Sequence, residues 1–223
     1  MPGARRREGS KKTLSDALIF DIDGTLWNAC SSSAKGWNLA LAKLGVPERV
    51  SAGQVESVSG KPFERCVDAL LPGLRTRHPE FLDTLSGCEQ AAVERDGGEF
   101  YEGAVETVTR LSHDFPVFLV SNCQEWYLRL FLDFSGLGPL LDGCDCHGQS
   151  GKPKSEMLTD IKRGKALSAP VYIGDTAADA AAARAAGMSH IHVSWGFGQP
   201  DAEAVVVDSF TELLACLRSA TPG

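Results

Sequence analysis

The feature of this sequence that most constrains its fold is a set of five short apolar runs, most of them continuous rather than alternating with polar residues. Continuous runs of strand length are typical of strands that are buried on both faces of a parallel sheet. The expected strands cover residues 17–20, 116–120, 171–173, 190–193 and 204–207. The pattern therefore predicts a buried parallel sheet.

Segments with the spacing of amphipathic helices separate these runs. The expected helices cover residues 104–111, 124–134, 155–163, 177–186 and 209–217. Ser209 and Glu212 have the spacing of a capping box at the start of the last helix, and Gly187 follows the fourth as a stop signal. Strands that alternate with helices predict a doubly wound, Rossmann-like α/β fold.

One region breaks this alternation. Residues 28–98 contain no convincing strand, while apolar residues such as Trp37 and Leu41 recur at helical spacing. A segment of roughly 70 residues is too long for a loop, so we expect a small helical domain inserted after the first strand. The core domain then consists of residues 16–27 and 99–223, with Gly97-Gly98 as a plausible return hinge.

The first 15 residues differ in character from the rest of the chain. They contain Gly, Ser and Pro together with a cluster of basic side chains, which are Arg5, Arg6, Arg7, Lys11 and Lys12. This composition predicts a solvated, disordered tail. A transit peptide is the alternative, but no amphipathic apolar face accompanies the basic residues.

The overall charge narrows the class of partners. A net charge of −7 argues against a nucleic-acid surface, which needs clustered Lys and Arg, but not against an anionic small molecule, for which one cationic pocket suffices. No apolar run has the length of a membrane span. We therefore expect a monomer or homodimer that binds a small metabolite and neither nucleic acid nor membrane.

The seven cysteines suggest the compartment. Their number is odd and no apolar signal segment precedes them, so we expect free thiols in a reducing cytoplasm. Cys144-Asp145-Cys146-His147 invites a zinc hypothesis, but it lacks the spacing and the second ligand pair of a structural zinc site. Zinc is therefore disfavoured here.

The first expected strand runs directly into Asp21-Ile22-Asp23-Gly24-Thr25. Residues two apart in an extended chain face the same way, so Asp21 and Asp23 can converge at the carboxyl edge of the sheet, where ligands bind in open α/β folds. Two carboxylates this close repel each other unless a cation or a shared proton offsets them, which predicts a metal or a division of roles. A calcium loop would need Gly and Glu where Leu26 and Ser32 stand.

Polar side chains also end two later strands. Ser121-Asn122 follow the second expected strand and Asp175 follows the third, with Asp179 one helical turn further on. Helix capping explains each residue alone, but not why acids and hydroxyls recur at strand ends. Lys152-Pro153-Lys154 lies between these strands, where a cation can neutralise a transferring phosphoryl group; a solvated basic loop is the alternative.

Taken in this order, DIDGT, SN, a lysine and GDTAAD resemble the motifs of the haloacid-dehalogenase-like phosphohydrolases, over residues 17–217. The resemblance implies a phosphatase in which Asp21 is the nucleophile and forms an aspartyl-phosphate. It implies that Asp23 is the acid/base that protonates the leaving oxygen and later activates water. Ser121 and Asn122 would bind the phosphate.

The resemblance also implies a magnesium site and a phosphate-clamping lysine. The carboxyl groups of Asp21 and Asp175 and the backbone carbonyl of Asp23 would bind Mg²⁺, and Asp179 would support the metal shell. Lys152 and Lys154 both match forms of the lysine motif. We favour Lys154, because it adjoins the expected helix start and can reach back over the strand edge.

The position of the helical insertion is similar to the type 1 cap of this family, and Trp195-Gly196-Phe197-Gly198 is similar to phosphoglycolate-phosphatase-like members. Phosphoglycolate is therefore the leading candidate substrate. Leu26-Trp27-Asn28 departs from the family, which usually has an acidic residue there. In the insertion, Lys61 and Lys35, with Arg65 as a weaker third, are expected to meet an anionic leaving group, although exposed cations often face only water.

Several alternatives stay open. A phosphomutase shares all the core motifs, and a phosphonate-cleaving relative needs a cap lysine, for which Lys35, Lys43 and Lys61 are candidates. A dehalogenase needs no acid at Asp23. From another class, a non-catalytic protein that binds or accepts phosphate, such as a receiver domain, would carry its phospho-accepting Asp on a middle strand and no helical insertion after the first.

Overall fold

The central sheet has six parallel strands in the order β5-β4-β1-β6-β7-β8. The computed structural model describes residues 15–202 and 204–219, so the basic stretch expected to be a tail lies outside the described residues. The strands are β1 (Ala17–Phe20), β4 (Val117–Ser121), β5 (Gly143–Cys146), β6 (Pro170–Gly174), β7 (Ser189–Val193) and β8 (Val205–Val207). The predicted doubly wound parallel sheet is thus confirmed.

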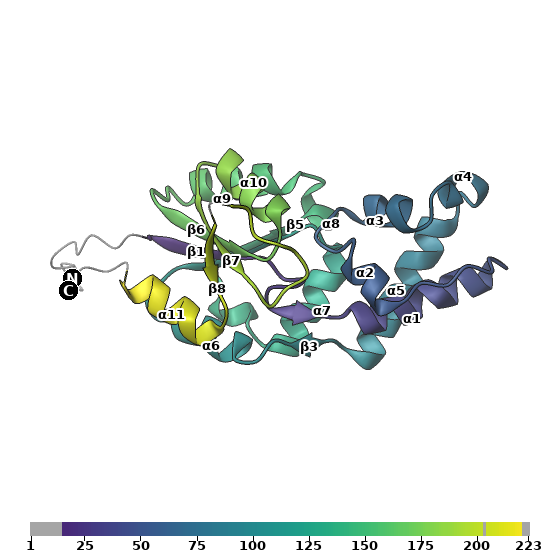
Figure 1. Cartoon of the computed structure of the whole chain (residues 1–223), viewed down its shortest axis with the longest axis horizontal. Coiled ribbons are helices and arrows are strands. Elements are labelled where there is room, and N and C mark those ends of the chain that lie inside the picture. Colours follow the sequence, from purple (N-terminus) through teal and green to yellow (C-terminus); the bar gives the residue numbers. More distant parts are fainter. Residues whose placement is uncertain (1–14, 203, 220–223) are drawn as a thin grey trace, which may run out of the picture.

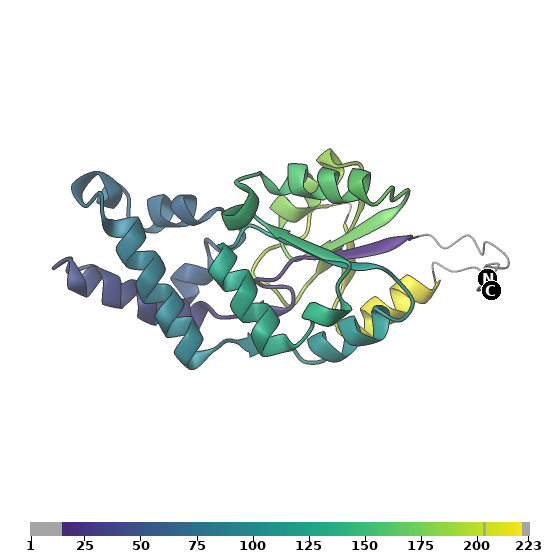
Figure 2. The same cartoon turned by 180° about the vertical axis from the view of Figure 1, so that it is seen from behind.

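Helices cover both faces of this sheet. Leu18 and Phe20 of β1 belong to one buried cluster, whereas Ala17 and Ile19 belong to another. The first cluster is covered by α6 (Ala104–Leu111), α7 (Glu125–Ser135) and α11 (Phe210–Ser219), and the second by α9 (Lys154–Gly164) and α10 (Ala177–Ala185) (Figure 1; from behind in Figure 2). Because successive side chains point to opposite faces, burial on both faces requires the continuous apolar runs seen in the sequence.

The edge strand β5 is the one strand of this sheet that the sequence did not reveal. It pairs only with β4, and Cys144 is exposed while Cys146 is buried. Its residues Gly143-Cys144-Asp145-Cys146 form no apolar run, which a strand with a neighbour on one side only can tolerate. The short helices near it are η1 (Gly138–Leu140) and α8 (His147–Ser150). Among the described residues, no group of three possible metal ligands includes Cys144, Cys146 or His147.

The segment between β1 and β4 forms a second body with its own apolar cluster. It contains five helices, here called the cap helices: α1 (Cys30–Lys43), α2 (Ala52–Glu56), α3 (Phe63–Leu70), α4 (Leu74–Arg77) and α5 (Phe81–Asp96). Figure 1 shows them on the side of the sheet toward which β1 runs. The longest, α5, has 16 residues, and no helix in the described ranges is long and apolar enough to cross a membrane.

A two-stranded antiparallel ribbon connects the cap helices to the core. It pairs β2 (Trp27–Asn28) with β3 (Glu99–Phe100). A Cβ on Gly98 would lie 2.1 Å from Nε1 of Trp27, so the backbone here packs directly on the indole ring. The adjacent Gly97 ends α5 with a φ of 68°, a conformation that favours glycine. The glycine pair is therefore required by close packing and by a turn at this junction.

Candidate active site

Three neighbouring strands bring the expected reactive residues to one edge of the sheet. Asp21 directly follows β1, Ser121 ends β4 and Asp175 directly follows β6, and these strands are adjacent in the sheet. The backbone N–H of Asp21 donates to the carbonyl of Ile173 at 2.9 Å, which continues the β1–β6 pairing up to the site. All three side chains are at least 98% buried, with exposed fractions of 1%, 2% and 0%.

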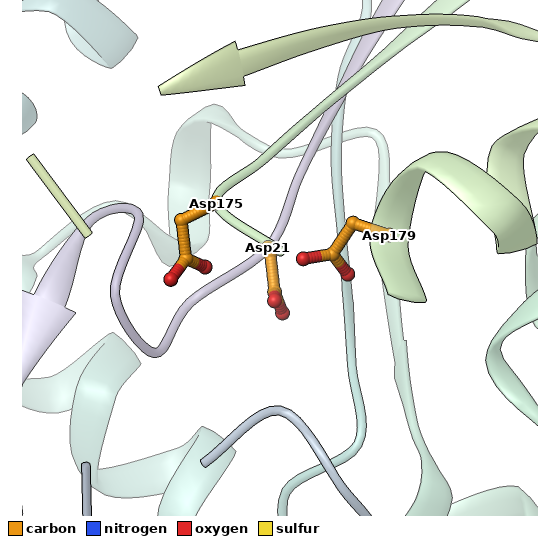
Figure 3. Close-up of side chains that lie close together, drawn as sticks. All are labelled: Asp21, Asp175 and Asp179. Atoms are coloured by element: carbon orange, nitrogen blue, oxygen red, sulfur yellow. The ribbon is translucent and has the colours of Figure 1, made fainter. Parts of the chain in front are cut away.

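The carboxyl groups of Asp21, Asp175 and Asp179 lie side by side, with Asp21 in the middle (Figure 3). One oxygen from each lies within 4.8 Å of the others. Burial raises the pKa of the Asp21 carboxyl, Lys154 opposes this rise, and the charges of Asp179 and Asp175 add to it. Burial and Asp179 likewise raise the pKa of Asp175 to about 6. The cluster therefore carries more carboxyl groups than its one lysine can balance.

This cluster fits a divalent cation with oxygen ligands. Oδ1 of Asp21 is buried and has no hydrogen-bond partner among the described residues. Three buried carboxyl groups that face one lysine leave negative charge uncompensated, which is costly, and Mg²⁺ is bound by carboxylate oxygens. Asp21, Asp175 and Asp179 form the group of possible ligands, but both oxygens of Asp179 already accept hydrogen bonds, so Asp21 and Asp175 are the residues that could hold the ion. The side chain of Asp23 lies outside this group of three ligands, so its expected contribution would come from its backbone carbonyl alone.

Lys154 is the lysine that the structure brings to the site. It begins α9, is 5% exposed, and donates to Oδ2 of Asp21 at 2.8 Å and to Oδ1 of Asp179 at 2.6 Å. Burial by itself lowers the pKa of Lys154, but Asp179 and Asp21 outweigh it and hold the pKa well above its usual value. A permanent cation thus lies against the expected nucleophile.

Lys152 is not brought to the site. Its ammonium pairs with Asp160 at 2.6 Å on the surface, and 46% of its side chain is exposed. Pro153 directly precedes α9 in an extended conformation, so Lys154 begins the helix and is buried, whereas Lys152 lies outside it. The structure therefore gives no support to the expected role of Lys152 in substrate binding.

Asp179 holds Lys154 and also caps a helix. One of its oxygens accepts from the hydroxyl of Thr176 at 2.6 Å and from the backbone N–H of Thr176 at 3.0 Å, which completes a capping box at the start of α10. Burial acts to raise the pKa of Asp179, but Lys154 and Thr176 lower it overall. The local sequence thus fixes a charged carboxylate that in turn positions the lysine.

Asp175 is oriented by two segments far apart in the sequence. Its oxygens accept from the backbone N–H of Phe197 at 2.7 Å and from the hydroxyl of Thr25 at 3.3 Å. A Cβ on Gly196 would lie 2.2 Å from Cβ of Asp175, so only glycine lets this backbone approach. The glycine-flanked aromatic stretch near residue 196 therefore serves to hold Asp175, a role that the sequence did not reveal.

Asp23 is paired with a residue that the sequence did not single out. The hydroxyl of Tyr127 on α7 donates to Oδ1 of Asp23. Burial raises the pKa of Asp23 to about 6, and the hydrogen bond from Tyr127 opposes this rise. A carboxyl group with a pKa near neutrality can both give and take a proton. Tyr127 fits the apolar pattern of an amphipathic helix, so nothing in the sequence marks it as a polar partner.

A cavity opens beside Asp23 between the core and the cap helices. Its volume is about 70 Å³, and its lining includes Asp23, Ser121 and Asn122 from the core. The amide of Asn122 donates to the carbonyl of Gly60 at 2.7 Å, which joins the core to a cap loop. Lys61 from that loop also lines the cavity but is exposed. Lys35 is not among the lining residues and pairs with Asp96 at 2.7 Å.

The cap side of the cavity carries a carboxyl group that sequence reasoning missed. Glu89 on α5 lines the cavity and is only 8% exposed. Burial raises the pKa of its carboxyl to about 7, and the nearby Ser33 and Trp37 oppose that rise. Helical periodicity places Glu89 among apolar neighbours, but it does not show that a cavity faces them.

The arrangement as a whole can carry out a displacement on an anionic group. It provides a buried carboxylate for attack, a lysine to offset charge, a hydroxyl and an amide to bind oxygens, and a second carboxyl to move a proton. Asp21 and Lys154 form the inner end of the site. Asp23 lines the cavity, whereas Asp21 and Lys154 do not, so a leaving group that meets Asp23 can extend into the cavity.

Known proteins share both the sequence pattern and the fold. The model of the haloacid dehalogenase-like hydrolase family matches residues 18–193. A phosphoglycolate phosphatase from Pseudomonas syringae pv. tomato is 30% identical, with 90% of this chain and 79% of the relative covered. A haloacid dehalogenase-like hydrolase from Streptococcus pneumoniae has a similar fold, with a TM-score of 0.79 at 19% identity over 92% of this chain and 99% of the other. A family hydrolase from Deinococcus radiodurans, solved with bound phosphate and sodium, is 28% identical with a TM-score of 0.67, covering 95% and 100%.

Proposed function

The chain belongs to the haloacid dehalogenase-like hydrolase family, and on that premise we propose that it is a Mg²⁺-dependent phosphatase of a small phosphomonoester that acts through an aspartyl-phosphate on Asp21. One observation carries the proposal. Asp21 is buried, Lys154 holds its Oδ2, and its Oδ1 has no partner in the part of the chain that the structure describes, so Oδ1 is the oxygen left for attack on a phosphorus atom. The chain is thus an enzyme, a hydrolase of phosphate esters.

In the first step, Oδ1 of Asp21 attacks phosphorus, and the bond from phosphorus to the leaving oxygen breaks. Lys154 offsets the charge on the transferring group, and Ser121 and Asn122 bind its oxygens. Asp23 gives its proton to the leaving oxygen, so the product leaves as an alcohol. In the second step, Asp23 takes a proton from water, the water oxygen attacks phosphorus, and the bond from phosphorus to Oδ1 of Asp21 breaks, which releases inorganic phosphate and the free Asp21 carboxylate.

A metal held by these residues would add charge compensation. When bound by Asp21, Asp175 and the backbone carbonyl of Asp23, Mg²⁺ supplies the positive charge that stabilises the transferring phosphoryl group. Phe197 and Thr25 hold Asp175 in position for this, and Asp179 keeps Lys154 in place. The relative from Deinococcus radiodurans that was solved with phosphate and sodium supports a site that takes an anion together with a cation.

The substrate is proposed at the level of its class. The relatives named phosphoglycolate phosphatase make phosphoglycolate the first compound to test. We further propose that residues 28–98 act as the cap domain, which covers the leaving group, because their helices supply one wall of the cavity beside Asp23. A phosphomutase would use the same core residues, and it would return the phosphoryl group to the alcohol instead of to water.

The proposal is tested by phosphate release from a panel of small phosphomonoesters, with Mg²⁺ and with a chelator. We expect release that depends on Mg²⁺ and a rate indistinguishable from background for Asp21→Asn, since an amide cannot form the acyl-phosphate. Acid-quenched wild-type enzyme should retain label from a radiolabelled substrate, and the variant should not. Appreciable turnover by Asp21→Asn would refute the mechanism, and an isomerised sugar phosphate without released phosphate would indicate the mutase.

A further inference from the structure

The cap side of the cavity contains two buried polar atoms whose hydrogen-bonding capacity is unused. Oε2 of Glu89 and Nε1 of Trp37 have no hydrogen-bond partner among the residues that the structure describes. Both side chains line the cavity, and they are 8% and 1% exposed. Buried polar groups are nearly always paired, so an unpaired acceptor and an unpaired donor in the same cavity wall point to a ligand.

The packing of α1 against α5 fixes these two groups beside each other. A Cβ on Gly36 would lie 2.4 Å from Cα of Glu89, so glycine at this position is what lets the two helix backbones touch. Trp37 is the next residue, and Ser33 lies four positions before it on the same face of α1. Ser33 and Trp37 both oppose the rise in the pKa of Glu89 through hydrogen bonding, so the indole N–H points toward this carboxyl, but the pair does not reach the geometry that would satisfy Nε1 of Trp37 and Oε2 of Glu89.

We propose that this pair binds an uncharged hydroxyl group of the leaving group, which donates to Oε2 of Glu89 and accepts from Nε1 of Trp37. A hydroxyl is both a donor and an acceptor and can satisfy both atoms at once. An ammonium cannot accept from the indole, and a carboxylate cannot donate to the glutamate. The substrate class is therefore the phosphate monoester of a polyhydroxy alcohol, either a polyol or a sugar.

The charges around the cavity favour the same class. Its lining contains two acidic side chains, Asp23 and Glu89, and a single basic one, Lys61. Glu89 is buried, so a second carboxylate placed against it would be repelled in a poorly screened environment, whereas Lys61 is exposed and its attraction is screened by water. The cavity thus discriminates against a leaving group that carries a carboxylate, as glycolate does.

This inference rests on the proposed phosphatase function and narrows its substrate. The test compares kcat/KM for four phosphate esters that share a two-carbon leaving group: hydroxyethyl phosphate, ethyl phosphate, aminoethyl phosphate and phosphoglycolate. Wild-type enzyme with Mg²⁺ should prefer hydroxyethyl phosphate to each of the others by about tenfold or more, because a site built for a hydroxyl leaves its polar groups unpaired with the analogues.

Variants assign this preference to the two residues. Glu89→Gln keeps an acceptor but removes the charge. The ratio of kcat/KM for hydroxyethyl phosphate to kcat/KM for phosphoglycolate should therefore fall by about tenfold. Trp37→Phe removes only the N–H, and the ratio of hydroxyethyl phosphate to ethyl phosphate should fall by a similar factor. Glu94→Gln, an exposed residue on the same helix, is the matched control and should leave both ratios unchanged. Each readout is a ratio within one variant, so a partly unfolded preparation does not change it.

Several results would overturn the inference that Glu89 and Trp37 bind a hydroxyl of the leaving group. One is a wild-type preference for phosphoglycolate, which would mean that Glu89 is protonated and donates to a carboxylate. Others are a wild-type preference for aminoethyl phosphate, or no preference for the ester that carries a hydroxyl. The inference also fails if the kcat/KM ratios of Glu89→Gln equal those of Glu94→Gln. Nitrophenyl phosphate separates the two levels of proposal. If the enzyme hydrolyses it without any hydroxyl preference, only the substrate inference fails, and if no ester is hydrolysed with Mg²⁺, the phosphatase proposal fails as well.

Discussion

The active edge of the sheet and the cap side of the cavity both bury carboxyl groups, but they are built differently. At the sheet edge, Lys154, Phe197 and Tyr127 each hold a carboxyl oxygen, and these donors come from separate parts of the chain. In the cap, two helices face each other and leave Oε2 of Glu89 without a partner among residues 15–202 and 204–219. In both regions, the carboxyl oxygen left unpaired is the one that we expect to meet the substrate.

This difference separates chemistry from recognition. Residues of the core contact groups that every phosphate ester has, so changes there should affect all substrates alike. Residues of the cap contact only the leaving group, so changes there should depend on the substrate. Four variants test this separation.

The largest effect is expected for Lys154→Met. The variant leaves Asp21 and Asp179 without their shared cation, and breaking a buried pair in this way costs about 3–5 kcal/mol of folding stability. We expect kcat/KM to fall by about 10²–10³ with every ester, since a preorganised charge at the reacting group is lost. Phosphate release and thermal melting measure the two effects.

Lys152→Met is the matched control for this prediction. Its exposed pair with Asp160 contributes at most about 1 kcal/mol, so both the rate and the melting temperature should stay close to those of the wild type. A severe loss in Lys152→Met together with a mild one in Lys154→Met would reverse the assignment of the phosphate clamp.

A change in helix packing should come next. Gly36→Ala introduces a Cβ that meets the backbone of α5, and overpacking of this kind costs about 1–3 kcal/mol. We expect the preference for hydroxyethyl over ethyl phosphate to fall by about fivefold to tenfold as Glu89 and Trp37 move apart. Gly87→Ala on the same α5 is the control, because its Cβ meets nothing within 4 Å and alanine favours a helix. Equal effects of the two substitutions would contradict the importance of the α1–α5 contact.

A smaller effect is expected for Tyr127→Phe. The lost hydrogen bond to Asp23 has a net value of about 1 kcal/mol, which corresponds to a fall of about fivefold in kcat for alkyl phosphates. Nitrophenyl phosphate should be less affected, because its leaving oxygen needs little help from a proton. Trp126→Phe removes a bond from α7 to Ser86 in the cap and should show no such dependence on the leaving group. If both esters slow equally in Tyr127→Phe, the tyrosine supports packing and does not position Asp23.

The smallest effect is expected for Lys61→Ala. Lys61 is an exposed residue of the cavity lining that interacts through water, and charges of this kind contribute about 1 kcal/mol or less. We expect kcat/KM for phosphoglycolate to fall by less than about fivefold. A larger fall that is confined to this anionic ester would support the expectation from the sequence that Lys61 binds an anionic leaving group. It would also contradict the inference from Glu89 that the cap side of the cavity disfavours such a group.

The sequence by itself determined the layers of the core and the location of the site. The run at residues 17–20 could be identified as β1 because burial on both faces of a parallel sheet demands consecutive apolar residues. Asp21, Ser121 and Asp175 could be assigned to one edge because parallel strands end on the same side. These inferences need only local patterns, since the geometry of a strand fixes where its end points.

Tertiary structure alone decided which side chains meet. The sequence offered Lys152 and Lys154 as alternatives, and only the fold shows that one reaches Asp21 while the other faces solvent. Tyr127 reaches Asp23 across 104 positions of sequence, and Glu89 meets Trp37 only because Gly36 lets two helices touch. The physical reason is that helical periodicity specifies which face of a helix is buried, whereas the neighbour against which that face is buried depends on packing between segments far apart in the chain.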